Sequence, residues 1–135
     1  MDLQLTNKVA LITGASRGIG RAIAETLASE GMKLILVARS RDKLEELAAS
    51  LKIECLVQAV DLREPNAPIT VINAAVERFG QIDVLVNNAG ATKRGDFLEL
   101  TEEDWGDGFA LKFYSTVRCS RAAWKHLQAS HGSII

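Results

Sequence analysis

The sequence predicts an α/β protein with a doubly wound parallel sheet. Three observations support this fold class. Short apolar runs alternate with longer segments of helical spacing, the first apolar run leads directly into a glycine-spaced turn, and no repeat or linker interrupts the alternation. The 135 residues fit one domain, which we expect to span residues 1–135 and to be incomplete at its C-terminus.

The first half of the chain contains two pairs of a strand and a helix. Residues 9–13 and 33–38 are near-continuous apolar runs, as in strands whose two faces are both covered by helices. Residues 19–30 form the first expected helix, which Gly31 ends, and residues 40–51 form the second, with Ser40 as its N-cap. The apolar stripe expected on the first helix comprises Ile19, Ala22, Ile23 and Leu27.

The second half continues the alternation. Expected strands are residues 55–60, 82–86 and the start of a fifth at 132–135. Expected helices are residues 69–79 and a long one from 101 to about 128. Pro68 suits the first turn of a helix, Gly80 suits a stop, and Thr101 with Asp104 forms a capping box.

Composition and charge exclude several classes of protein. The net charge of −1, without a basic cluster, argues against a nucleic-acid partner, because such a surface must neutralise phosphates. No apolar run approaches the ~20 residues of a membrane span, and no basic segment with an apolar signal core begins the chain. Cys55 and Cys119 form no C-x-x-C pair, so we expect no metal site. We therefore expect a cytoplasmic protein without membrane contact.

A glycine-spaced turn follows the first expected strand, with Gly14, Gly18 and Gly20 at its key positions. Glycines let the backbone approach an anion closely, and the free N–H groups and positive dipole end of the following helix hold negative charge. Ligands of doubly wound sheets bind beyond the carboxyl ends of the strands. The segments expected at that edge are residues 14–20, Arg39, Asp61 and residues 87–90.

Residues 13–20, Thr-Gly-Ala-Ser-Arg-Gly-Ile-Gly, together with residues 87–90, Asn-Asn-Ala-Gly, resemble the short-chain dehydrogenase/reductase family. The resemblance extends over residues 8–135. It implies a Rossmann fold and an oxidoreductase that transfers hydride between a nicotinamide dinucleotide and a small alcohol or carbonyl substrate. A glycine motif alone would also fit an ordinary tight strand-to-helix turn.

The resemblance assigns roles within the glycine turn. It implies that Gly14 permits the turn, Gly18 allows close approach to the pyrophosphate, and Gly20 allows the helix to pack on the strand. It places Ser16 and Ile19 in contact with the cofactor beside them.

The resemblance also assigns roles to the later loops. It implies that Asp61 accepts a hydrogen bond from the adenine amino group and that the backbone of Leu62 donates one. It implies that Asn88, Ala89 and Gly90 line the floor of the cofactor site and fix the fourth strand. The alternative for Asp61 is a carboxylate that only caps a loop, and for Asn88 to Gly90 a mainly structural role.

The choice of cofactor follows from charge. Ala38 occupies the position, about 20 residues after the glycine turn, where an NAD enzyme carries an acid for the ribose 2′-OH. Arg39 follows it directly, Arg17 lies in the glycine turn, and Ser40 adds a hydroxyl. Because guanidinium groups match phosphate geometry, we predict NADP(H). The alternative is that both arginines are solvated surface residues.

The catalytic groups of the resembled family lie outside this sequence. The family uses a Tyr, a Lys four residues later and a Ser, which all follow the start of the fifth strand. Tyr114 precedes that strand and has Arg118 four residues on, so we predict no catalytic residue in this chain and interpret Tyr114 as helix surface. We expect the chain to be the N-terminal part of a longer protein.

Lys112 departs from the family pattern. The family has an Asn at this position, seven residues after Trp105, where it holds a water that links the catalytic Lys to solvent. A cation there would depress the pKa of that Lys, replace the relay, or mark a variant site. The alternative is a lysine that snorkels at the edge of the helix.

Two functions remain open at this point. The first is an NADP(H)-dependent oxidoreductase represented by its cofactor-binding half. The second is a non-catalytic NADP-binding module or sensor, which the missing Ser, Tyr and Lys favour. A homo-oligomer is also open, because residues 110–123 would suit helix pairing between subunits or packing on the sheet.

Overall fold

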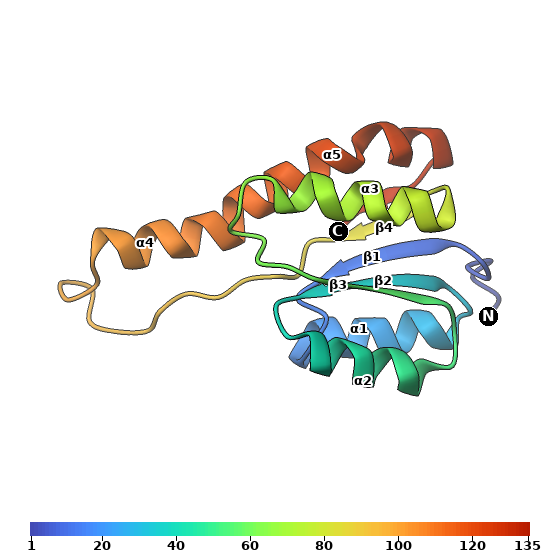
Figure 1. Ribbon diagram of the computed structural model, residues 1–135, viewed down its shortest axis with the longest axis horizontal. Helices are drawn as coiled ribbons and strands as arrows, with labels where there is room; N and C mark the ends of the chain where they lie inside the picture. The colour runs from blue at the N-terminus through green and yellow to red at the C-terminus, as the bar shows by residue number, and fades with distance from the viewer.

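A computed structural model describes residues 1–135, which form a five-stranded parallel sheet between two layers of helices (Figure 1). The strands are β1 (Val9–Thr13), β2 (Lys33–Ala38), β3 (Cys55–Ala59), β4 (Val84–Val86) and β5 (Ser133–Ile134). The helices are α1 (Gly18–Ser29), α2 (Arg41–Leu51), α3 (Ala67–Phe79), α4 (Glu102–Phe109), the π-helical η1 (Ala110–Tyr114) and α5 (Ser115–Ser130). The predicted Rossmann fold is confirmed.

The strand order is β3-β2-β1-β4-β5, so the direction of the chain across the sheet reverses at β1. Strand β1 pairs with β2 on one side and with β4 on the other, with Leu11 opposite Ile35 and Leu85. Crevices that bind ligands open at such a reversal, outside the carboxyl ends of the strands. The glycine turn after β1 lies at this point.

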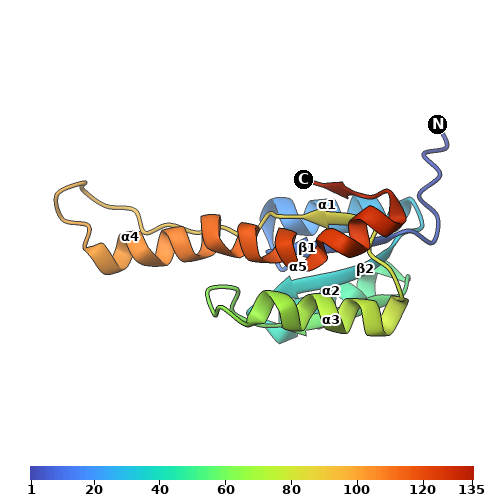
Figure 2. The same ribbon diagram turned by 90° about the horizontal axis from the view of Figure 1, so that it is seen from above.

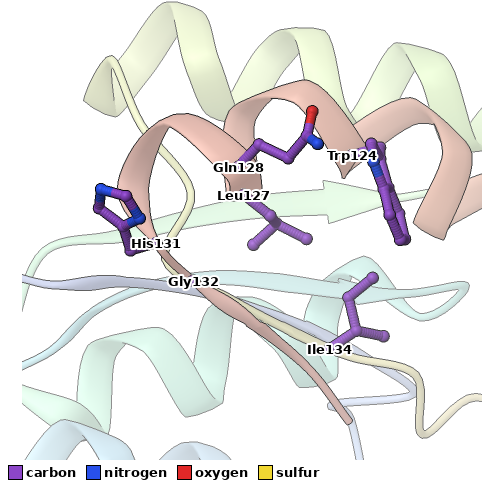
Figure 3. Close-up of a pocket in the computed structure, with 6 residues that line it drawn as sticks. All are labelled: Trp124, Leu127, Gln128, His131, Gly132 and Ile134. Atoms are coloured by element: carbon purple, nitrogen blue, oxygen red, sulfur yellow. The ribbon is translucent and has the colours of Figure 1, made fainter.

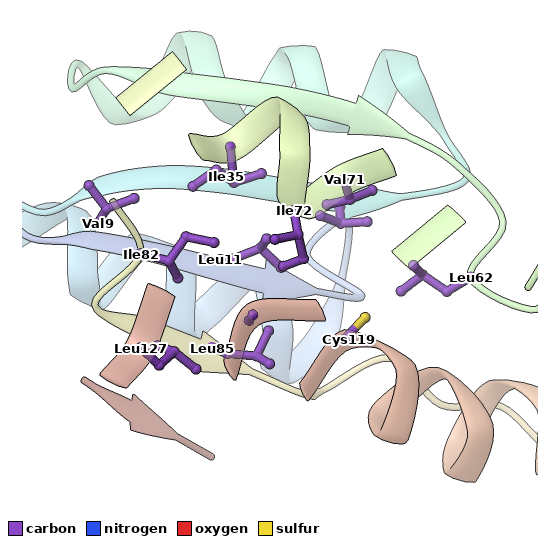
Figure 4. Close-up of a cluster of buried hydrophobic side chains, with 13 residues drawn as sticks. Val9, Leu11, Ile35, Leu62, Val71, Ile72, Ile82, Leu85, Cys119 and Leu127 are labelled. Carbon is purple, nitrogen blue, oxygen red and sulfur yellow. The ribbon is translucent and has the colours of Figure 1, made fainter. Parts of the chain in front are cut away.

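Two apolar cores hold the layers together, one on each face of the sheet. Helices α1 and α2 cover one face, and α3 and α5 cover the other (Figures 1 and 2). Alternate residues of β1 enter different cores: Leu11 packs with Ile72 of α3 and Cys119 of α5 (Figure 4), whereas Ile12 packs on the α1 and α2 side. Burial on both faces explains the continuous apolar runs.

The apolar stripe predicted for α1 is confirmed only in part: Ile23 and Leu27 pack against the core, whereas Ile19 and Ala22 are exposed. The helix faces the sheet with Gly20, Ala24 and Ala28, and Ile19 is 74% exposed. A Cβ at Gly20 would overlap the carbonyl oxygen of Gly14 and lie 2.5 Å from Asn88 Nδ2. The helix therefore packs too closely on the glycine turn for large side chains, and the small residues form the buried stripe.

Strand β4 is shorter than the predicted residues 82–86, because the Asp83 side chain, and not a backbone carbonyl of the strand, accepts the hydrogen bond of the Val9 N–H. That side chain is almost fully buried, and its Oδ2 accepts hydrogen bonds from the Val9 backbone N–H at 2.8 Å and from Gln81 Nε2 at 2.9 Å. Pairing with β1 begins at Ala10 and Val84. Asp83 thus fixes the amino end of β4 against β1.

The predicted long helix is interrupted. Thr101 and Asp104 form the predicted capping box at the start of α4, but residues 110–114 are π-helical before α5 continues to Ser130. The α4 end projects beyond the sheet (Figure 2). A π segment adds one residue to a turn and is common at functional sites. Apolar periodicity cannot reveal one added residue.

Other helix ends differ in detail. Ser40 lies at the N-cap of α2 as predicted, but its side chain makes no capping hydrogen bond. Pro68 lies in the first turn of α3 and Gly80 ends it in a left-handed conformation, φ +77°. None of the helices is both long enough and apolar enough to cross a membrane.

Candidate functional site

A cleft of about 720 Å³ lies beyond the carboxyl ends of the strands. All of the predicted site residues except Gly20 line it: Gly14, Ser16, Arg17, Gly18, Ile19, Arg39, Ser40, Asp61, Leu62, Asn88, Ala89 and Gly90. Gly20 lies beneath it and is buried. The cleft is also lined by residues that the sequence did not predict as binding residues, although Ala38 was singled out for cofactor choice: Val37, Ala38, Lys43, Val60, Ala91 and Leu111. Of these, Lys43 carried a signal, since it lies in the first turn of a helix that starts at the same edge.

The glycine turn presents free donors to this cleft. Gly14 and Gly18 have φ of +66° and +58°, which side-chain-bearing residues rarely adopt. Arg17 at the N-cap of α1 makes no capping hydrogen bond, and no acidic residue lies in the first helical turn. The N–H groups and the positive end of the helix dipole therefore remain available to an anion.

Thr13 and Asn88 tie the glycine turn to the loop after β4. The Thr13 hydroxyl accepts hydrogen bonds from the backbone N–H groups of Asn88, at 3.0 Å, and Ala89, at 2.9 Å. Asn88 Nδ2 in turn donates to the carbonyl oxygens of Thr13, at 3.0 Å, and Gly14, at 3.2 Å. These bonds favour the structural role that the sequence left open for Asn88.

Two arginines border the cleft without acidic partners. Arg17 and Arg39 are exposed, and neither lies within 4.0 Å of a carboxylate, whereas the nearby Arg21 is paired with Glu25 and Glu46. A dianionic ligand group can therefore approach two guanidinium groups that have no competing intramolecular partner.

Asp61 is held by Arg63, a residue that the sequence analysis missed. The guanidinium bonds the carboxylate side-on, with Nε 3.0 Å from Oδ1 and Nη2 2.7 Å from Oδ2. The Arg63 backbone N–H also donates to Oδ1 at 3.0 Å. The hydrogen bond from the Arg63 side chain lowers the pKa of Asp61, and the charges of Arg63 and Arg39 lower it further. The Asp-x-Arg spacing was the only available signal.

Lys112 lies next to the cleft without lining it. A Cβ on Gly90 would be 3.2 Å from Lys112 Cγ and 3.3 Å from Cε, so the lysine stem covers Gly90. Its neighbour Leu111 lines the cleft. This contact brings the π-helical segment against the loop after β4.

The remaining reactive side chains lie outside the cleft. Tyr114 is half exposed, with the Arg118 guanidinium 5.3 Å from its ring centroid. Burial raises the pKa of both Cys55 and Cys119 to about 11, which keeps the thiols protonated and unreactive at neutral pH. No group of three or more His, Cys, Asp or Glu side chains is placed to hold a metal.

A second hollow, of about 640 Å³, lies between the end of α5 and β5 (Figure 3). Trp124, Leu127, Gln128, His131, Gly132 and Ile134 line it. It carries one titratable side chain, His131, and no arrangement of polar groups that converge on a ligand. It therefore offers no comparable chemistry.

The fold and the glycine turn define a Rossmann-type domain of the dinucleotide-binding kind. A family model described as short chain dehydrogenase matches residues 8–135. The chain belongs to the short-chain dehydrogenase family. The resemblance in the motifs is thereby confirmed.

Individual relatives agree with this assignment. The chain is 36% identical over 134 residues to 3-oxoacyl-[acyl-carrier-protein] reductase FabG of Escherichia coli (strain K12), covering 98% of this chain and 55% of that protein. It is 34% identical over 134 residues to meso-2,3-butanediol dehydrogenase of Serratia marcescens, covering 98% and 53%. The chain thus spans about half the length of these curated relatives.

Solved structures show the same fold. The structure of L-sorbose reductase from Gluconobacter frateurii complexed with NADPH and L-sorbose has a TM-score of 0.95 and 40% identity, covering 99% of this chain and 53% of that one. A short chain dehydrogenase from Burkholderia cenocepacia J2315 in complex with NADP has a TM-score of 0.88 and 32% identity, covering 91% and 52%.

Proposed function

We propose that this chain is the NADP(H)-binding part of an oxidoreductase that acts on a small alcohol or carbonyl substrate. The observation that carries the proposal is the pair of unpaired guanidinium groups, Arg17 and Arg39, beside a glycine turn with open N–H groups. Ala38 leaves the end of β2 without the carboxylate that a ribose 2′-OH would need at that position. Two structural neighbours were solved with NADPH or NADP, which supports the choice.

The residues of the cleft fit the cofactor in charge and shape. The N–H groups at the start of α1 would hold the pyrophosphate, with Gly18 leaving open space where a Cβ would stand. Arg17, Arg39 and Ser40, with Lys43 nearby, would hold the 2′-phosphate. Ser16 and Ile19 would flank the pyrophosphate.

Other residues that line the cleft suit the bases. Asp61 and the backbone of Leu62 would recognise adenine, and Asn88, Ala89 and Gly90 would form the floor. The bound cofactor supplies the hydride or accepts it. This chain's own residues would bind and orient the dinucleotide.

A titration of the chain with NADPH and NADH, followed by nicotinamide fluorescence, tests the binding proposal. We expect NADPH to bind more tightly than NADH. Equal affinity, or no binding of either, contradicts it. Oxidation of NADPH by a panel of carbonyl compounds, assayed with natural protein of measured intact mass, tests the enzyme. Binding without turnover by a natural protein of 14.7 kDa would instead support the alternative, a non-catalytic module or sensor.

Two further features belong to the proposal. A cytoplasmic location agrees with the two free cysteines, because reduced thiols persist in a reducing compartment.

A homo-oligomer agrees with an exposed apolar stripe at i, i+4 spacing along α4, η1 and α5, formed by Trp105, Phe109, Phe113 and Val117. Analytical ultracentrifugation of the wild-type protein and of a Phe109→Ser/Phe113→Ser variant tests it. The variant should sediment as a species of lower mass than the wild type only if the stripe joins subunits.

A further inference from the structure

Three charged side chains meet where β2 and β3 end. Strands β2 and β3 run in register to the pair Ala38 and Ala59, and the Val60 N–H donates to the Ala38 carbonyl at 3.0 Å. Arg39 and Asp61 therefore leave neighbouring strands at the same edge, and both line the cleft. Asp61 nevertheless pairs with Arg63 and not with Arg39.

The Asp61 carboxylate has little acceptor capacity left. Its Oδ1 accepts from both the backbone N–H and Nε of Arg63, each at 3.0 Å. Its Oδ2 accepts from Nη2 at 2.7 Å and shares the single Nε hydrogen with Oδ1, at 3.1 Å. Each carboxylate oxygen accepts about two hydrogen bonds, so Oδ2 retains room for roughly one more donor, such as an adenine amino group.

A second carboxylate holds the guanidinium from the other side. Arg63 Nη1 lies 3.7 Å from Oδ2 of Asp107, on α4. The loop that joins β3 to α3 passes beside this helix (Figure 1). Arg63 thus lies between two carboxylates, and it does not line the cleft that holds Arg39.

We propose that Arg63 is a positioning residue for cofactor choice: it binds the Asp61 carboxylate, and so leaves Arg39 free to bind the 2′-phosphate of NADPH. The inference rests on the proposed function. Without Arg63, the freed carboxylate would share the cleft with Arg39, whose charge already lowers the Asp61 pKa. It then pairs with Arg39 and also repels a dianionic phosphate, whereas a ribose 2′-OH is unaffected by that repulsion.

The test is Arg63→Gln, titrated with NADPH and NADH and with the fragments 2′-phospho-AMP and 5′-AMP. We expect affinity for the two ligands with a 2′-phosphate, NADPH and 2′-phospho-AMP, to fall by about tenfold, and affinity for NADH and 5′-AMP to change by less than about twofold. The readout is the ratio of the affinity for NADPH to that for NADH, and of the affinity for 2′-phospho-AMP to that for 5′-AMP. General loosening of the fold would weaken the binding of all four ligands alike and leave these ratios unchanged.

Two variants and one control sharpen the test. In an Asp61→Asn background, which has no carboxylate to release, Arg63→Gln should leave the ratio unchanged. Arg63→Lys keeps the charge but loses the side-on pair, so its affinity ratio should lie between those of the wild type and Arg63→Gln. It replaces Arg63→Gln in the test if that variant fails to fold. Arg78→Gln is the matched control, because Arg78 pairs with Glu54 at 3.2 Å at the opposite end of β3.

The outcomes separate this inference from the function on which it rests. Failure of the wild-type chain to prefer NADPH contradicts the proposed function. A wild-type preference that survives unchanged in Arg63→Gln overturns the role of Arg63 alone. An effect of Arg63→Gln that persists undiminished in the Asp61→Asn background also overturns it, because the effect then does not act through the carboxylate.

Discussion

Replacement of Arg39 by Asp should convert the cleft from one that favours NADPH to one that favours NADH. Arg39 is exposed and unpaired in the structure, so its loss breaks no internal ion pair. The change removes one positive charge and adds one negative charge beside a phosphate that carries about −1.5 to −2. At about 4 Å in a water-like dielectric each pair of unit charges is worth about 1 kcal/mol, and salt reduces this.

The expected loss for NADPH is therefore about 2–3 kcal/mol, or about 30- to 150-fold in affinity. The new carboxylate can accept a hydrogen bond from the ribose 2′-OH, which should improve NADH binding by about 0.5–1.5 kcal/mol. Fluorescence titrations of both cofactors at low and high salt measure these changes. The NADPH loss should shrink as salt rises.

Arg41→Asp is the control for Arg39→Asp. Arg41 lies two residues further along the chain, pairs with Glu45 at 3.6 Å and does not line the cleft, so the same change in charge should alter NADPH affinity much less. Equal weakening of NADPH and NADH by Arg39→Asp would refute the assignment of Arg39 to the 2′-phosphate. So would an equal effect of the two variants on NADPH.

Three predictions concern stability. Gly20→Ala should lower the free energy of unfolding by more than about 2 kcal/mol, because the new Cβ would overlap backbone atoms. Gly18→Ala should lower it by only about 1–2 kcal/mol, because the space there is open and only the φ of +58° is unfavourable. Urea denaturation of the two variants compares these losses. Asp83→Ala should cost about 1–3 kcal/mol in the same assay, because the buried Val9 N–H loses its acceptor. The pKa of Asp61 is lowered in the folded protein, so the stability that its carboxylate contributes is present above about pH 4 and is lost as pH falls through the folded-state pKa. When the free energy of unfolding is measured against falling pH, the Asp61→Asn variant should therefore lose less stability than the wild type.

The parts of the site that are local in sequence could be predicted from it. The glycine turn, the strand before it and the loop at Asn88 to Gly90 follow from short motifs and apolar runs, and the structure brings them to one cleft. Arg39 could be assigned to the same edge because the end of a parallel strand fixes its position.

The features that depend on a packing distance or on a partner far away in the chain could not be predicted from the sequence. The α1 stripe was wrong at Ile19 and Ala22, because Gly20 lies so close to the glycine turn that small residues face the sheet there. Helical periodicity does not encode that packing distance. The role of Asp83 depends on Val9, 74 positions away in the chain. The contact of Arg63 with Asp107 requires α4 to pass beside the loop after β3, which no local pattern indicates.

The bonds between Thr13 and Asn88 bear on how the cleft meets its ligand. Because the Thr13 hydroxyl also donates to the Val86 carbonyl, at 3.3 Å, it is saturated by partners from the β4 segment. The backbone at Asn88 and Ala89 is thus held in place before any ligand arrives, so binding at these two residues should cost little ordering entropy. Amide hydrogen exchange at Asn88 and Ala89 should accordingly be slow and nearly the same with and without dinucleotide. The ligand-dependent changes in amide exchange should concentrate at the N–H groups at the start of α1, which would bind the pyrophosphate.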